Sequence, residues 1–184
     1  MIQKNLIVIF FYLASISIVQ TVIDPLQQWI IKNDSTLDAS WIFLPHGVRV
    51  LSVLLLGYIC FPGLWIAAFL HGLLYLSPSD TEIVLLITSL LSAIAVMIAY
   101  RFHFVRTIPN LDDITLKNIL KLSVSISVIS SLLINFFRWM VGETFELHEI
   151  LSQTLLYFIG DNIGAIVFFL LITNIKKILL QHAK

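Results

Sequence analysis

The residue best placed to do chemistry is Asp161, a carboxylate in the middle of an apolar run. Residues 155–160 before it and 162–171 after it are almost all hydrophobic or small. A carboxylate near the centre of a membrane span costs roughly 2.5–3.5 kcal/mol on insertion scales, and such a residue usually faces a cavity or a polar partner. We therefore predict that Asp161, together with the amide of Asn162, belongs to a binding site or to a polar contact that locks helices together.

Three basic side chains on other apolar segments are candidate partners for Asp161. His46 and Arg49 begin the second apolar run, and His71 lies in the third. A carboxylate close to a cation stays ionised, whereas one left alone in an apolar site takes up a proton. The functional interpretation is a small pocket, opening outward, in which these groups bind a polar ligand or a proton. The structural alternative is that Arg49 pairs with Asp161 to hold the helices, while both histidines hydrogen-bond to the backbone.

Small residues accompany these polar groups. Gly160 and Gly164 have the four-residue spacing that lets two membrane helices approach closely. We expect Gly47 and Gly57 to serve helix packing as well. The fifth apolar run carries four serines near one face, a pattern that is typical of helix packing. These serines are Ser123, Ser127, Ser130 and Ser131.

The sequence contains no motif of a known enzyme active site. It has no Gly-x-Ser-x-Gly, no His-Glu-x-x-His and no glycine-rich phosphate loop. Cys60 is the single cysteine, which excludes an intramolecular disulfide and a multi-cysteine metal site. We expect a protein that is not an enzyme and has no metal site, and the residues identify no cofactor.

A membrane-embedded helical bundle must position these residues. The 184 residues are 59% hydrophobic and 12% charged, and their mean hydropathy is +0.97. Soluble proteins average roughly 25% charged residues, about twice as many. The formal net charge is zero, so nothing suggests a nucleic-acid partner. We predict one all-α integral membrane domain, residues 1–184, in contact with the lipid bilayer.

Six apolar runs are candidates for the helices of this bundle. A membrane span needs about 20 residues, and two of the runs, 48–61 and 64–76, are too short. A single helix over 48–76 would be ~43 Å long, and proline disrupts a helix interior. We therefore predict a tight turn at Pro62-Gly63 and about six spans, with five as the alternative. The runs are 6–23, 48–61, 64–76, 83–100, 119–137 and 151–175.

The basic residues predict how the bundle is oriented. With six spans and a cytoplasmic N-terminus, eight Lys and Arg lie inside and three outside, as the positive-inside rule requires. Five spans with an outer N-terminus place nine inside and two outside, so charge does not decide the number of spans. Both arrangements put residues 101–118 and the C-terminus in the cytoplasm, and we expect the bacterial inner membrane. The eight inside residues are Lys4, Arg101, Arg106, Lys117, Lys121, Lys176, Lys177 and Lys184.

Residues 24–40 are expected to form the first outer loop. Asp24-Pro25 should end the first helix, because the residue before a proline disfavours helical geometry. Leu26, Trp29 and Ile30 then recur at helical spacing, which favours a short interfacial helix.

Four short motifs occur in order along the chain. They are Pro45-His-Gly47, Leu54-Leu-Leu-Gly57, Phe61-Pro-Gly63 and Gly160-Asp-Asn-Ile-Gly164. With this order and spacing, residues 41–72 and 155–172 resemble the first class of the membrane-associated sensor domain, the MASE type. The resemblance implies a sensory region that receives an input at the membrane and passes it to a cytoplasmic output. This chain departs from the family in having fewer spans, in His46 and Arg49, and in ending at Lys184, where we expect no output domain.

We accordingly expect a standalone sensor-like membrane protein that binds a small ligand or proton in its outer half. It would act through a partner signalling protein. Two alternatives stay open. The size and number of spans also resemble the substrate-binding component of energy-coupling-factor transporters, and a structural subunit of a membrane complex would have the same composition.

Overall fold

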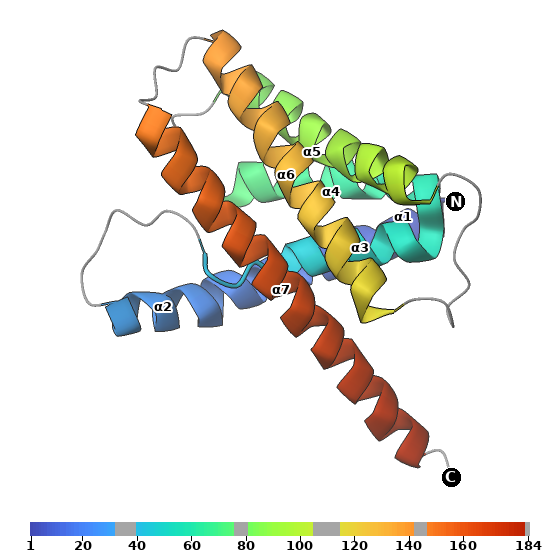
Figure 1. Ribbon diagram of the computed structural model, residues 1–184. Helices are drawn as coiled ribbons and strands as arrows, with labels where there is room; N and C mark the ends of the chain where they lie inside the picture. Colours follow the sequence, from blue (N-terminus) through green and yellow to red (C-terminus); the bar gives the residue numbers. More distant parts are fainter. Residues whose placement is uncertain (32–39, 76–80, 105–114, 142–146, 183–184) are drawn as a thin grey trace.

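The computed structural model is built of helices. It describes five stretches of the chain, 1–31, 40–75, 81–104, 115–141 and 147–182, and the side chains at 31, 147–153 and 175–182 are outside the description. Every regular element in these stretches is a helix, which confirms the all-α prediction (Figure 1). The helices are α1 (Ile2–Ile18), η1 (Val19–Ile23), α2 (Asp24–Ile31), α3 (Leu44–Leu56), η2 (Gly57–Cys60), α4 (Phe61–Tyr75), α5 (Glu82–His103), α6 (Leu116–Val141) and α7 (Leu147–His182).

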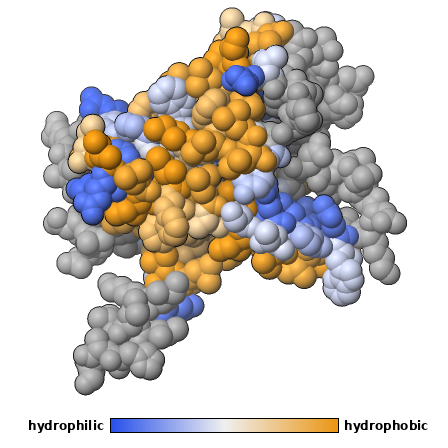
Figure 2. Space-filling view, turned by 180° about the vertical axis from the view of Figure 1, so that it is seen from behind, coloured by the Kyte–Doolittle hydropathy of each residue, from blue (hydrophilic) through white to orange (hydrophobic). Residues whose placement is uncertain are grey.

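Five stretches of these helices are long and apolar enough to cross a membrane. They are Ile2–Ile30, Leu44–Tyr75, Glu82–His103, Leu116–Val141 and Thr154–Asn174. Large hydrophobic side chains cover the outer surface of these helices. In a soluble protein most of these side chains would be buried. Figure 2 shows this as a broad apolar face with hydrophilic atoms gathered toward its two ends. The protein is therefore a multi-pass membrane protein.

The second of these stretches folds back on itself. The ring of Phe43, just before α3, lies 6.1 Å from the ring of His71, near the end of α4. A straight helix would hold these two residues ~42 Å apart, at ~1.5 Å per residue. α3 and α4 therefore run in opposite directions, as Figure 1 shows, and the described helices pass through the bundle six times. This confirms the prediction of two short helices.

The turn between α3 and α4 lies earlier than we predicted. Pro62 is in the first turn of α4, where a missing N–H does no harm. The helix instead breaks at Gly57, whose backbone has φ 57° and ψ −138°. Residues that carry a Cβ rarely adopt this conformation. A Cβ at Gly57 would meet Tyr100 only at an ordinary 3.5 Å. Gly57 thus serves the turn rather than the helix packing that we predicted.

The first helix does not end at Asp24-Pro25, contrary to our prediction. α1 continues through the π-helical turn η1 into α2. In a regular α-helix Pro25 would clash with the carbonyl group four residues earlier. In the wider turn the Asp24 N–H donates to the Val19 carbonyl oxygen, five residues back, which makes room for the proline. α2 projects beyond the other helices in Figure 1, and Trp29 on it is 78% exposed.

The two predicted loops are described only in part. In the outer loop, 24–40, residues 32–39 lie outside the described residues. In the loop predicted at 101–118, residues 105–114 do so as well, whereas the residues at either end of it belong to α5 and α6. Both helices are therefore longer than their apolar runs.

Six helices close into a ring. Neighbours around it are α1, α3, α7, α6, α5 and α4, and α4 returns to α1. α3 also reaches across the ring to α5 and α6. An apolar core fills the half of the ring nearest the start of α1, with Val53, Val96 and Leu122 fully buried. The opposite half contains the candidate site.

Candidate functional site

A cavity of about 440 Å³ occupies the half of the ring away from the chain termini. Its lining begins near the middle of the bundle, at Tyr12 of α1, Ser92 of α5 and Ser127 of α6. From there it runs to the start of α2 at Asp24 and toward the end of α6 at Arg138. Small-molecule sites usually measure about 300–1,000 Å³, so the cavity is large enough for a small ligand.

Much of the cavity wall is polar, which is unusual inside a membrane bundle. Polar groups in a membrane interior are costly unless they meet a partner or water. The hydroxyl and amide residues of the lining are Tyr12, Gln20, Ser40, Tyr75, Thr88, Ser89, Ser92, Ser127, Ser130, Ser131, Asn135 and Tyr157. Three of the four serines that we assigned to helix packing belong to this set.

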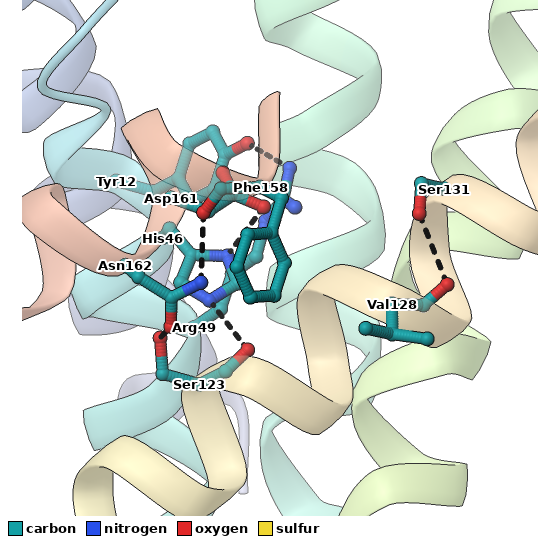
Figure 3. Close-up of polar contacts among 9 residues, drawn as sticks. All are labelled: Tyr12, His46, Arg49, Ser123, Val128, Ser131, Phe158, Asp161 and Asn162. Carbon is teal, nitrogen blue, oxygen red and sulfur yellow. Dashed lines mark hydrogen bonds and ion pairs between the residues drawn. The ribbon is translucent and has the colours of Figure 1, made fainter. Parts of the chain in front are cut away.

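His46 joins three helices at the side of the cavity floor. It is 0% exposed on α3, and its Nδ1 lies 3.2 Å from Oδ2 of Asp161 on α7. Its Nε2 lies 3.2 Å from the carbonyl oxygen of Ser123 on α6. The Ser123 hydroxyl donates to Oδ1 of Asn162 at 2.8 Å, and the Asn162 amide donates to the Phe158 carbonyl oxygen at 2.7 Å. Figure 3 shows these groups as one connected cluster.

The contacts of His46 determine the number of protons that it shares with Asp161. The Ser123 carbonyl oxygen can only accept, so Nε2 carries a hydrogen. Nδ1 and Oδ2 are at ion-pair distance but outside hydrogen-bond geometry. Two bare lone pairs at this distance would repel, so one proton is held by either the imidazole or the carboxyl group. Both placements give the His46–Asp161 pair a net charge of zero.

Arg49 does not take Asp161 as its ion-pair partner. Among the described residues, the carboxylate has only His46 within 4.0 Å. One guanidinium nitrogen of Arg49 donates to the Tyr12 hydroxyl at 2.8 Å. The guanidinium carbon lies 5.6 Å from the centre of the Tyr12 ring and 5.7 Å from that of Phe43, which is cation–π geometry. The structural alternative of an Arg49–Asp161 lock is therefore replaced by a lock through His46.

His71 lies on the cavity wall among aromatic rings. Its ring centre is 6.4 Å from that of Tyr12, 6.1 Å from Phe43 and 6.0 Å from Tyr75. The structure thus brings His71 and Arg49 to the same pair of rings, Tyr12 and Phe43. His46 instead contacts Asp161.

The glycines of α7 pack against a non-helical segment of the chain, and not against another helix as we predicted. The Phe43 N–H donates to the Gly160 carbonyl oxygen at 3.0 Å. A Cβ on Gly160 would collide with the Ser40 carbonyl oxygen, and a Cβ on Gly164 with that of Phe43. We call residues 40–43 the strap, because they cross α7 at these glycines and carry Phe43 into the cavity wall.

Gly47 has the packing role that we predicted. A Cβ there would overlap the side chain of Phe168 on α7, so this glycine allows α3 and α7 to approach closely.

Comparison of the chain with models of protein families, with curated proteins and with solved structures found no match.

Proposed function

We propose that this protein is a sensor-like membrane receptor that binds a small ligand in the cavity and acts through a partner protein. The observation that carries the proposal is the polar cavity itself. It is about 440 Å³ in volume, and Arg49 and Asp161 lie at its floor inside an otherwise apolar bundle. Charged groups in membrane helices most often mark a ligand or ion pathway.

The contacts around the cavity support a transmitted signal. Arg49 and Phe43 belong to the cavity wall, and the strap that holds Phe43 is hydrogen-bonded to α7. A ligand that moves either side chain would thereby act on α7, the 36-residue helix that extends beyond the bundle in Figure 1. The MASE-like order of motifs supports the same proposal, since Pro45-His-Gly47 follows the strap and Gly160-Asp-Asn-Ile-Gly164 contains Asp161.

Filling the cavity is expected to remove the bound ligand. In Ser131→Phe an aromatic ring replaces a hydroxymethyl group on the cavity wall, whereas Leu132→Phe makes a similar change at a position 65% exposed toward lipid. Native mass spectrometry of the detergent-extracted proteins should show a retained small molecule in the wild type and in Leu132→Phe. Its occupancy should fall by at least about tenfold in Ser131→Phe, because binding sites of this kind depend on close contact. Equal occupancy in both variants, or no retained molecule in any of them, would contradict the proposal.

A second candidate, also of the binding class, is the substrate-binding component of a small-molecule transporter. The apolar core beneath the cavity closes it on one side, and this favours capture from the other side of the membrane, which either function would use. The two differ in their partner. Co-purification with an ATPase from native membranes supports the transporter component, whereas co-purification with a signalling protein supports the receptor.

A further inference from the structure

The charges at the cavity floor indicate which class of ligand the cavity takes, and this inference rests on the function proposed above. We propose that the ligand is a small organic anion whose carboxylate binds the guanidinium of Arg49. Three observations carry the proposal: the charge balance of the floor, the hydrogen-bond donors of Arg49, and the hydroxyl groups around it.

The charge balance follows from the His46–Asp161 contact. Since that pair holds one proton, its net charge is zero whichever residue carries it. His71, a histidine of the cavity wall, contributes no negative charge. Arg49 therefore gives the floor a net charge of +1 in a region of low dielectric. A bound anion would neutralise this charge, whereas a bound cation would add to it.

The hydrogen-bond donors of Arg49 favour a carboxylate. The guanidinium group has five N–H donors in a rigid fork that matches the two oxygens of a carboxylate. Among the described residues, only one hydrogen bond from these donors is found, to the Tyr12 hydroxyl. The rings of Tyr12 and Phe43 fix the plane of the guanidinium, so the remaining donors are held in position before the ligand arrives.

The rest of the wall suits the body of such an anion. Ser92 and Ser127 line the same cavity as Arg49 and offer hydroxyl donors to a bound anion. Nearer the mouth, the rings of Tyr75 and Tyr157 and the side chain of Ile134 provide apolar surface. The charged residues of the mouth are Asp24 and Arg138, whose opposite charges cancel. The net charge that the ligand meets is therefore that of the floor.

Three probes of one shape test the proposal: benzoate, benzyl alcohol and benzylammonium. Each is titrated into the detergent-purified full chain at constant ionic strength, and the midpoint of thermal unfolding is followed, since a ligand that binds only the folded state raises it. Benzoate should raise the midpoint saturably, while the neutral and cationic probes should not. In Arg49→Gln the benzoate affinity should fall by at least about tenfold, as expected for the loss of a charge-assisted pair. Arg101→Gln is the matched control, since Arg101 is exposed at the other end of the bundle.

The results separate this inference from the function on which it rests. Saturable binding of benzoate that is lost in Arg49→Gln and kept in Arg101→Gln supports the carboxylate site. A stronger shift with benzylammonium, an equal benzoate shift in Arg49→Gln, or no saturable benzoate shift overturns it. If mass spectrometry at the same time detects a retained neutral or cationic molecule that Ser131→Phe loses, the receptor function stands and only the anion assignment falls. If no molecule is retained, the receptor function falls with it.

Discussion

Replacing Asp161 by leucine is expected to lower the free energy of unfolding by about 3 kcal/mol, the upper range for leaving a buried polar group without a partner. His46 is 0% exposed, and the Asp161 carboxyl group is what its Nδ1 faces. His46→Leu should cause a similar loss, because it removes the partner of a carboxyl group that is only 12% exposed. Both losses can be measured by titration of the purified protein with SDS in mixed micelles.

The double variant shows whether the two residues act as one unit. His46→Leu with Asp161→Leu replaces the pair by apolar groups, and such replacements are often neutral. The double variant should therefore be more stable than the sum of the single losses predicts, by about 1–3 kcal/mol of coupling. Asp161→Asn is the conservative control: its amide can donate to Nδ1, so it should cost less than about 1 kcal/mol. Additive losses in the double variant would show that the contact is not a stabilising pair.

Adding a methyl group at Gly164 is expected to destabilise the fold by about 2–3 kcal/mol, the upper part of the usual range for overpacking. The new Cβ would meet backbone atoms of Phe43, which cannot rotate away as a side chain could. The sign of the effect is informative, since alanine stabilises a helix by roughly 0.8–1 kcal/mol relative to glycine where space allows. Ile163→Ala, at a neighbouring position 39% exposed, serves as the control.

The strap gives this variant a second consequence. Because residues 40–43 carry Phe43 to the face of Arg49, Gly164→Ala should also weaken ligand retention in native mass spectrometry. An unchanged or higher stability of Gly164→Ala in SDS titration would mean that the strap does not lie against α7.

Hydropathy and length predicted the helices well, because a membrane interior requires long apolar segments whose backbone groups are paired within the helix. The errors lie where local geometry departs from regular helix. Pro62 was the expected break, but proline fits the first turn of a helix, and Gly57 makes the turn through a positive φ that nothing in its flanking residues indicates. At Pro25 a π-helical turn absorbed the proline that we expected to end the helix.

The sequence predicted which residues belong to the candidate site, but not which basic residue contacts Asp161. His46 and Arg49 are three residues apart and share one face of α3, so either could have met Asp161. Which one does so depends on the rotation of α3 against α7, and Gly47 packs against Phe168 where these two helices meet. The serines of α6 were assigned to packing because the same spacing suits a helix contact and a cavity wall. Only the arrangement of the neighbouring helices separates these two roles.

Cysteine labelling tests most directly whether a water-accessible cavity enters the bundle from the side away from the chain termini. The native Cys60 is 0% exposed and gives a silent background. A thiol reacts with the charged reagent 2-sulfonatoethyl methanethiosulfonate as a thiolate, which requires water. Ser131→Cys on the cavity wall should be labelled in intact membranes, from that side alone, whereas Leu132→Cys on the lipid face should not. Equal labelling of the two cysteines, or no labelling of Ser131→Cys, would show that no such water-accessible cavity exists.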